Sequence, residues 1–273
     1  MTFRGLKLQL QSASGLYRKV DLAYPSNRFA VTVALVAGVV VAIFARDVWV
    51  AFFSAAATFC TWALGREMDP DRSRTANLGA ITMGLVLSVF ALNNRLVLRD
   101  VVLGAVVTGS MMVIARALTR STGLGATALD VATLFAVALG SGLIDPQVGV
   151  ILVAVATLGI AVDRALEQHP YLGNWRWFGF TLFAFIGAYF VWRSGPWLAP
   201  TGFVLALGTL NIVLALNSEP SSRSDRGTRF EPSRFIVANL LVSLAATALI
   251  SHGLPLAIVG LLAVGLWKIW PHP

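Results

Sequence analysis

Residues 29–64 read FAVTVALVAGVVVAIFARDVWVAFFSAAATFCTWAL, an apolar run whose only charged residues, Arg46 and Asp47, lie at its midpoint. A helix needs about 17–25 apolar residues to cross a bilayer, so this run is too long for one span. Charged side chains are costly inside the hydrocarbon layer, which places Arg46 and Asp47 at a membrane surface. The stretch therefore predicts two spanning helices, at 29–45 and 48–64, joined by a tight turn.

The same pattern fills most of the remaining chain. The apolar runs are continuous rather than alternating, which favours helices over a β-barrel. Hydrophobic residues make up 57% of the chain, charged residues 12%, and the mean hydropathy is +0.76, which excludes an ordinary soluble domain. The sequence thus predicts an all-α fold, a polytopic membrane bundle of about ten helices arranged as five hairpins. The expected spans are 29–45, 48–64, 77–92, 100–118, 127–144, 147–162, 177–192, 198–216, 235–250 and 254–270.

The hairpins recur at intervals of about 50 residues, which suggests an internal repeat. Closely spaced spans of any origin would give a similar period, so duplication and coincidence both remain open. Two arrangements also remain open: five parallel hairpins, or two inverted halves at 29–144 and 147–270. At the level of fold, the span count and chain length are similar to those of drug/metabolite-type transporters, and this resemblance implies inverted five-span halves.

Basic residues predict the orientation of the bundle. Only four of the 21 Lys and Arg residues fall in the tight turns, and the other 17 lie in the N-terminal segment, the longer connections and the C-terminal region. By the positive-inside rule both termini are cytoplasmic. The excess of Arg over Lys is typical of GC-rich prokaryotic coding, so we expect a prokaryotic cytoplasmic (inner) membrane.

Two segments are expected to lie outside the bundle of residues 29–270. Residues 1–28 contain a short amphipathic stretch that could lie on the cytoplasmic leaflet. Residues 217–233 are rich in Ser, Pro, Gly and Arg and predict a flexible cytoplasmic loop. The expected partners are the lipid bilayer and anionic phospholipids at the cytoplasmic face. The net charge of +8 is explained by the positive-inside pattern, so no nucleic acid is expected. A homo-oligomer or a second membrane protein remains open as a partner.

The densest group of charges is the run REMDPDRSR, residues 66–74. Asp69 and Asp71 could hold Mg²⁺, since hard cations prefer oxygen ligands, while neighbouring arginines could hold the phosphate of a lipid. The alternative is a solvated turn, in which Asp-Pro-Asp ends the helix and the arginines contact anionic lipid. The candidate residues in this run are Arg66, Glu67, Asp69, Asp71, Arg72 and Arg74.

Three further polar residues lie in or near the predicted spans. Asp130 lies seven residues into an apolar stretch that starts at Leu124 and could be a functional buried acid, but its spacing from Thr127 fits a helix capping box better. Arg116 lies at the inner end of its span, where a snorkelling side chain is the simple interpretation. Asn211 is an amide well inside the span 198–216, so it predicts an interhelical hydrogen bond or a substrate contact.

No motif identifies a reaction. The histidines lack the spacing of a zinc site, and neither a glycine-rich phosphate loop nor a Gly-x-Ser-x-Gly site is present. No metal site is therefore assigned, catalytic residues stay unknown, and Mg²⁺ enters only if the chain acts on a lipid phosphate. The favoured hypothesis is a transporter for a small solute or lipid. The alternatives are a membrane-embedded enzyme or binder for a phosphorylated (iso)prenoid or phospholipid at the cytoplasmic face, and a non-catalytic scaffold or accessory subunit.

Overall fold

The computed structural model describes residues 14–16, 18, 20–168, 186, 198–216 and 221–269. Within these ranges the chain is helical and contains no β-strand, as the continuous apolar runs predicted. The helices are α2 (Pro25–Ala45), α3 (Val48–Met68), α4 (Ser73–Leu92), α5 (Leu98–Thr119), α6 (Ala128–Ile144), α7 (Pro146–Gln168), α9 (Leu198–Leu216), α10 (Pro232–Ser251), the short 3₁₀-helix η2 (Leu256–Ile258) and α11 (Val259–Ile269). Each predicted span that falls on described residues overlaps one of these helices.

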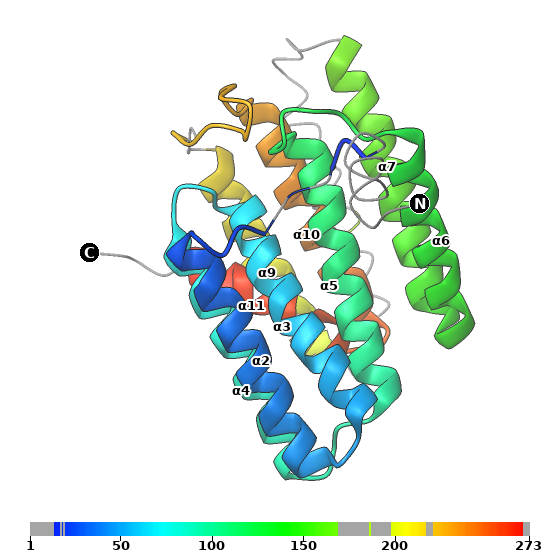
Figure 1. The fold of residues 1–273 in the computed structure, drawn as a ribbon. Helices are drawn as coiled ribbons and strands as arrows, with labels where there is room; N and C mark the ends of the chain where they lie inside the picture. Colours follow the sequence, from blue (N-terminus) through cyan, green and yellow to red (C-terminus); the bar gives the residue numbers. More distant parts are fainter. Residues whose placement is uncertain are drawn as a thin grey trace, which may run out of the picture.

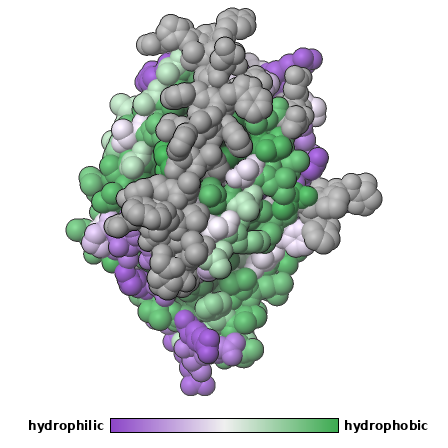
Figure 2. Space-filling model, turned by 180° about the vertical axis from the view of Figure 1, so that it is seen from behind, coloured by the Kyte–Doolittle hydropathy of each residue, from purple (hydrophilic) through white to green (hydrophobic). Residues whose placement is uncertain are grey.

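Seven of the described helices are long and apolar enough to cross a membrane: α2, α3, α4, α5, α7, α9 and α10. Helix α6 and the segment formed by η2 and α11 are apolar but shorter. Hydrophobic side chains also dominate the surface visible in Figure 2, with a hydrophilic tip at its lower end. The chain is thus a multi-pass helical membrane protein. The count of ten spans and the hairpin repeat stay predictions, because the expected span 177–192, apart from residue 186, lies outside the described residues.

The first hairpin shows how the sequence sets a turn. Arg46 ends α2 in the left-handed conformation, with φ of 52°, and its N–H donates to the carbonyl of Ala42. Asp47 then caps α3, because its side chain accepts hydrogen bonds from the backbone N–H groups of Trp49 and Val50 at 2.8 and 3.1 Å. Such caps satisfy backbone groups that have no partner within a helix. The charged pair in the middle of the apolar run therefore forms the predicted turn.

The helices of the bundle are connected at two opposite ends (Figure 1). We call the upper one in the figure the connection end; there the chain passes through residues 69–72, 120–127 and 221–231. We call the other one the turn end; there the chain reverses at residues 46–47, 93–97, 145 and 252–255. The prediction that the connection end is cytoplasmic follows from the basic residues and is not tested by the fold.

Helix α10 lies at the centre of the bundle. Every residue from Ser233 to Ile250 is buried, and the helix contacts α5, α7, α9 and α11. Helix α2 is peripheral by contrast, and its residues Leu35, Val36 and Val39 are exposed. An exposed apolar face is what a helix presents to lipid, so α2 fits the edge of the bundle and α10 its core.

Small residues allow the helices to approach closely, as is common in membrane bundles. A Cβ atom added to Gly65 of α3 would lie 2.7 Å from the Cα atom of Ala76 in α4. A Cβ atom on Gly260 of α11 would lie 2.6 Å from Oγ1 of Thr61 and 2.7 Å from Oγ1 of Thr108. The glycines therefore fix how near α11 can pack against α3 and α5.

The chain between α10 and α11 does not reach the tip of the turn end. It is recessed into the bundle. A Cβ atom on Gly104, in the second turn of α5, would lie 3.3 Å from the carbonyl oxygen of Leu256. At 1.5 Å per residue, Gly104 is about 9 Å inside the end of α5 at Leu98. This recessed turn forms the floor of a pocket at the turn end, described below.

Candidate functional site

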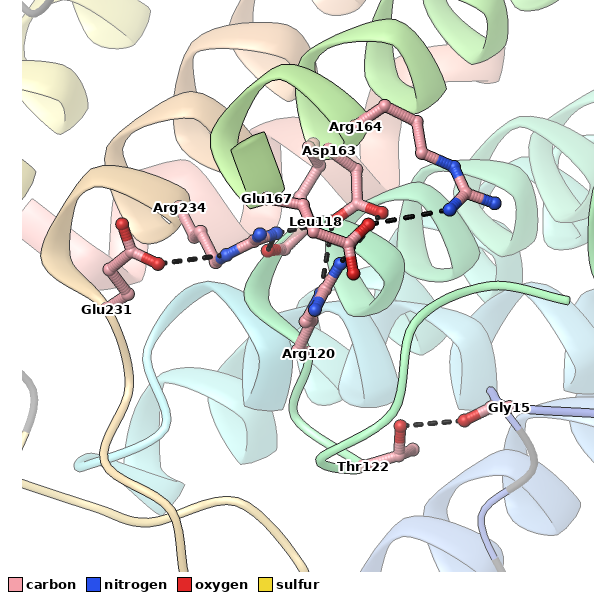
Figure 3. Close-up of polar contacts among 9 residues, drawn as sticks. All are labelled: Gly15, Leu118, Arg120, Thr122, Asp163, Arg164, Glu167, Glu231 and Arg234. Atoms are coloured by element: carbon pink, nitrogen blue, oxygen red, sulfur yellow. Dashed lines mark hydrogen bonds and ion pairs between the residues drawn. The ribbon is translucent and has the colours of Figure 1, made fainter. Parts of the chain in front are cut away.

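A network of buried charges joins three helices at the connection end (Figure 3). Asp163 of α7 is 6% exposed and accepts from two arginines. Arg234, in the first turn of α10, donates through Nη1 to Oδ1 of Asp163. Arg120, the residue that ends α5, donates through Nε to Oδ1 at 3.2 Å and through Nη2 to Oδ2 at 3.4 Å. The carboxylate of Asp163 therefore ties the ends of α5, α7 and α10 together.

Further carboxylates complete this network. Glu167 pairs with Arg120 and Arg164, both at 3.4 Å, and Glu231 accepts from Nε of Arg234 at 3.0 Å. Burial acts to lower the pKa of the Arg120 guanidinium, but its hydrogen bond to Asp163 and the negative charges around it outweigh this and raise that pKa. Arg120 is thus held as a cation against Asp163 and Glu167.

A second charged group lies at the same end, between α3 and α5. Glu67 is 2% exposed, and its Oε1 atom accepts from Nε of Arg116 at 2.8 Å. Arg18 lies 3.7 Å from the same oxygen and pairs with Asp225 at 2.6 Å. Nη1 of Arg116 also donates to the carbonyl oxygen of Leu16 at 3.2 Å. Glu67 and Arg116 thus join α3 and α5 to the N-terminal segment of the chain and, through Arg18, to the loop before α10.

One oxygen of this pair is left over. Oε2 of Glu67 is buried and has no hydrogen-bond partner among the described residues. A buried carboxylate oxygen without a partner is costly in a core, so this atom marks a place where a water molecule, an ion or a ligand group could bind. Two predicted candidates, Glu67 and Arg116, are therefore brought together from positions 49 residues apart in the sequence.

The other carboxylates of the run 66–74 do not join Glu67. Asp69 is buried and accepts a hydrogen bond from the hydroxyl of Thr75 at 2.6 Å. Asp71 accepts from the backbone N–H groups of Ser221 and Ser222 at 2.8 and 2.7 Å. Within the described part of the chain, no group of three or more His, Cys, Asp and Glu side chains is arranged to hold a metal ion. The three acids therefore face three different neighbours.

The arginines of the same run are less constrained. Arg66 is partly buried at the end of α3, and Arg72 and Arg74 flank the start of α4. Among the described residues, none of these three forms an ion pair. They are available to anionic groups at the membrane surface, as the lipid-contact interpretation of the sequence proposed.

Asp130 serves as a helix cap, the interpretation that its spacing from Thr127 favoured. Thr127 and Asp130 form a capping box at the start of α6. Asp130 also accepts from the hydroxyl of Ser14 at 2.5 Å and from the N–H of Gly15 at 2.9 Å. The hydroxyl of Thr122 donates to the carbonyl of Gly15 at 2.8 Å. These bonds hold residues 14–16 across the ends of α5 and α6, a contact that the sequence gave no sign of.

Asn211 lies in the core, as its position in an apolar run predicted. Its Nδ2 atom donates to the carbonyls of Leu207 at 2.9 Å and of Gly265, in α11, at 3.2 Å. The interhelical hydrogen bond is thus present. Oδ1 of Asn211 is buried, has no hydrogen-bond partner in the described part of the chain, and borders a cavity of about 20 Å³ that Ser243 also lines. That volume accommodates one water molecule rather than a solute.

Sequence inspection missed a buried lysine. Lys268 of α11 is 6% exposed and donates to Oδ1 of Asn239 at 2.5 Å, and its Nζ atom lies 4.9 Å from the ring centre of Phe235. It forms no ion pair with a described residue. Its position inside the last apolar run was the only sign of burial that the sequence offered. That sign was easily overlooked, because the side chain of a basic residue near a helix end normally extends to the membrane surface. The burial of Asp163 and Arg234 was equally unforeseen.

Two larger hollows accompany these charges. A pocket of about 490 Å³ lies at the turn end, and the recessed turn between α10 and α11 forms its floor. It is lined by Phe90, Arg95, Arg99, Asp100, Leu103, Gly253, Leu254, Pro255, Leu256, Ala257 and Val259. A groove of about 450 Å³ lies between α5 and α6. At the turn end, the described residues form a single ion pair, between Arg99 and Asp145 at 2.5 Å.

The two ends therefore differ in what they can do. The connection end is cross-linked by charges that need low mobility to stay paired, while the turn end is hollow and bears the exposed residues Arg95 and Arg99. Comparison with known protein families, with curated proteins and with solved structures finds no match to this chain.

Proposed function

We propose that this chain is a membrane transporter for a small solute or lipid, and that the ion pairs at the connection end form its closed gate. The observation that carries the proposal is the difference between the ends. One end has a pocket of about 490 Å³, and the other is tied by Asp163, Glu67 and their arginines. Alternating access needs this asymmetry, because a site must be open to one side while the other side is closed.

Ion pairs are suitable gates for physical reasons. A buried pair loses the hydration of both charges and gains their attraction, so its net contribution to stability is small. An exchange of partners that keeps each charge paired therefore avoids the cost of a buried unpaired charge. Arg120 and Arg234 come from different helices and share one acceptor, Asp163, so movement of α7 relative to α5 and α10 would open both contacts together.

The proposed orientation follows from the basic residues. With the connection end cytoplasmic, the pocket at the turn end opens to the outside of a prokaryotic inner membrane. Its floor at Leu256 lies next to Gly104, and one turn deeper Thr108 of α5 faces Gly260. The oxygen Oγ1 of Thr108 is buried, and no residue that the structure describes forms a hydrogen bond with it. A path from the pocket into the bundle would therefore meet this hydroxyl first.

The test is thiol labelling from each side of the membrane. The only cysteine, Cys60, is replaced by Ser, and a single cysteine is placed either at Leu254, in the pocket, or at Thr119, which is buried at the connection end. A membrane-impermeant thiol reagent is applied to intact cells and to inverted vesicles. We expect the cysteine at position 254 to react from outside and the one at 119 to be protected from inside.

The substitution Asp163→Asn then distinguishes a gate that opens during transport from a contact that only stabilises the structure. If the ends alternate, opening the connection end increases labelling at position 119 and decreases labelling at 254. If only position 119 responds, the two ends are not coupled and the transport proposal fails. Arg164→Gln removes an exposed ion pair on the same helix and serves as the control, because the Arg164 and Glu167 side chains are 66% and 47% exposed.

The alternative functions have less support. An enzyme acting on a lipid phosphate through Mg²⁺ would require carboxylates that converge, whereas Glu67, Asp69 and Asp71 contact Arg116, Thr75 and the loop at 221–222. For the scaffold or accessory subunit, no contact of the described residues favours a particular partner. The arginines of residues 66–74 fit contact with anionic phospholipids, which is compatible with transport.

A further inference from the structure

The second hollow of the bundle is a groove between α5 and α6. It measures about 450 Å³, and it is lined by Ser14, Leu16, Ala105, Val106, Gly109, Ser110, Met112, Val113, Leu129, Asp130, Thr133, Leu134 and Val137. Most of these side chains are apolar. Of the polar ones, Ser14, Asp130 and Thr133 lie at or near the connection end, and Ser110 lies in the middle of α5. The groove is therefore amphipathic along its length.

The groove faces outward rather than into the bundle. Val137 of α6 is 39% exposed, Leu129 is 46% exposed, and both border the hollow. Helix α5 crosses the membrane by length and hydropathy, so its residues 105–113 lie at the depth of the lipid chains. A mostly apolar hollow that is open to the surroundings at this depth contacts acyl chains, because hydrocarbon rather than water surrounds the bundle there.

The polar end of the groove lies next to the charged network. Arg116 is one turn beyond Met112 and Val113 on α5, so it continues the face that lines the groove. Its Nε and Nη1 atoms donate to Glu67 and Leu16, and among the described residues its Nη2 atom has no partner. An arginine with a free N–H group beside an apolar channel matches a phosphate ester on a chain.

We propose that the groove between α5 and α6 holds one phospholipid of the leaflet at the connection end, with an acyl chain along Val106, Val113 and Val137 and its phosphate at Arg116. The lipid is anionic by preference, since the connection end carries most of the basic residues of the chain. This site is separate from the pocket at the turn end and does not depend on the transport proposal.

The experiment counts lipids on the intact chain. The protein is extracted in a mild detergent and examined by native mass spectrometry, and we expect one phospholipid per chain to survive detergent washing. Val137→Trp fills the groove from α6 and should remove that lipid. Leu139→Trp is the matched control: it lies on the same helix, is 65% exposed and does not line the groove, so it should leave the lipid bound.

The outcomes are distinguishable. Equal lipid retention in the Val137→Trp and Leu139→Trp variants overturns the proposal, as does the absence of any retained lipid from the unchanged protein. If Val137→Trp does not fold, as judged by its thermal unfolding midpoint, Val106→Phe fills the groove from the α5 side and repeats the test. Delipidated protein is then offered phosphatidylglycerol or phosphatidylcholine vesicles. Preferential uptake of phosphatidylglycerol supports the assigned preference for an anionic lipid, and equal uptake overturns that preference.

Discussion

The ion pair between Glu67 and Arg116 allows a quantitative test of the connection end. The Glu67 side chain is 1% exposed and that of Arg116 is 13% exposed, so the substitution Arg116→Met leaves a nearly buried carboxylate without its main partner. Removing one member of a buried pair costs about 3–5 kcal/mol. Arg18, at 3.7 Å and 38% exposed, remains as a second cation, so we expect about 3 kcal/mol, the low end of that range.

The double variant isolates the interaction. Replacing both members with apolar residues of similar size removes the unpaired charge, so Glu67→Met with Arg116→Met should cost about 1 kcal/mol or less. Arg116→Met also removes the hydrogen bond to the carbonyl of Leu16, but this loss occurs in both variants and cancels in the cycle. The expected coupling between the two positions is therefore about 2 kcal/mol or more.

The assay is reversible unfolding in mixed micelles, followed by the fluorescence of the eight tryptophans. Arg164→Met is the control, since its ion pair with Glu167 is exposed and should contribute about 0.2–1 kcal/mol. The reasoning is refuted if Arg116→Met costs no more than Arg164→Met. It is refuted equally if the effects of the single substitutions at 67 and 116 add in the double variant.

Three further predictions concern single positions. Gly149→Val should destabilise the protein by about 1–3 kcal/mol, because even a Cβ atom there would lie 2.4 Å from the Cα atom of Gly142. A Cβ atom on Gly140 would have nothing within 4 Å, so Gly140→Ala should be neutral or slightly stabilising. Thermal unfolding of both variants checks this. Thr127→Ala removes the side-chain cap of α6 and should cost about 0.5–2 kcal/mol in the micelle assay, and no change would contradict the capping role. Burial alone would raise the pKa of Asp71, but hydrogen bonds from residues 221 and 222 outweigh it and lower that pKa. The contact between Asp71 and the loop should therefore persist above the ordinary aspartate pKa of about 3.9 and weaken only as the pH falls below it. A carbon NMR titration that places the pKa of Asp71 above about 3.9 would refute this.

Helices and turns could be predicted because their causes are local. The charged residues Arg46 and Asp47 interrupt an apolar run and supply a cap, so the turn forms where the sequence places it. The capping box of Thr127 and Asp130 depends on residues three apart and was predicted for the same reason. Pro232 at the start of α10 and Gly253 after its end also mark boundaries by their backbone preferences.

The candidate site could be predicted only in part. Glu67 and Arg116 were identified as charged residues near the ends of their spans, but their partnership across 49 residues depends on α3 packing against α5. Asp163 and Arg234 lie 71 residues apart and were not singled out as a pair. Residue type and spacing give the charge and depth of a side chain, whereas the neighbour that it meets depends on the order of helices around the bundle.

The sequence by itself determined that this protein lies in a membrane as a set of apolar helices, because the cost of exposing backbone groups or charges to lipid depends on residues that are close together along the chain. Only the tertiary structure decided which charges are paired, which polar atoms are left without partners and where the bundle is hollow. Between neighbouring helices in lipid there is little hydrophobic driving force, so their arrangement is set by close packing at residues such as Gly65 and Gly260. That packing depends on shape across the whole bundle, and the pattern of apolar residues along one helix does not encode it.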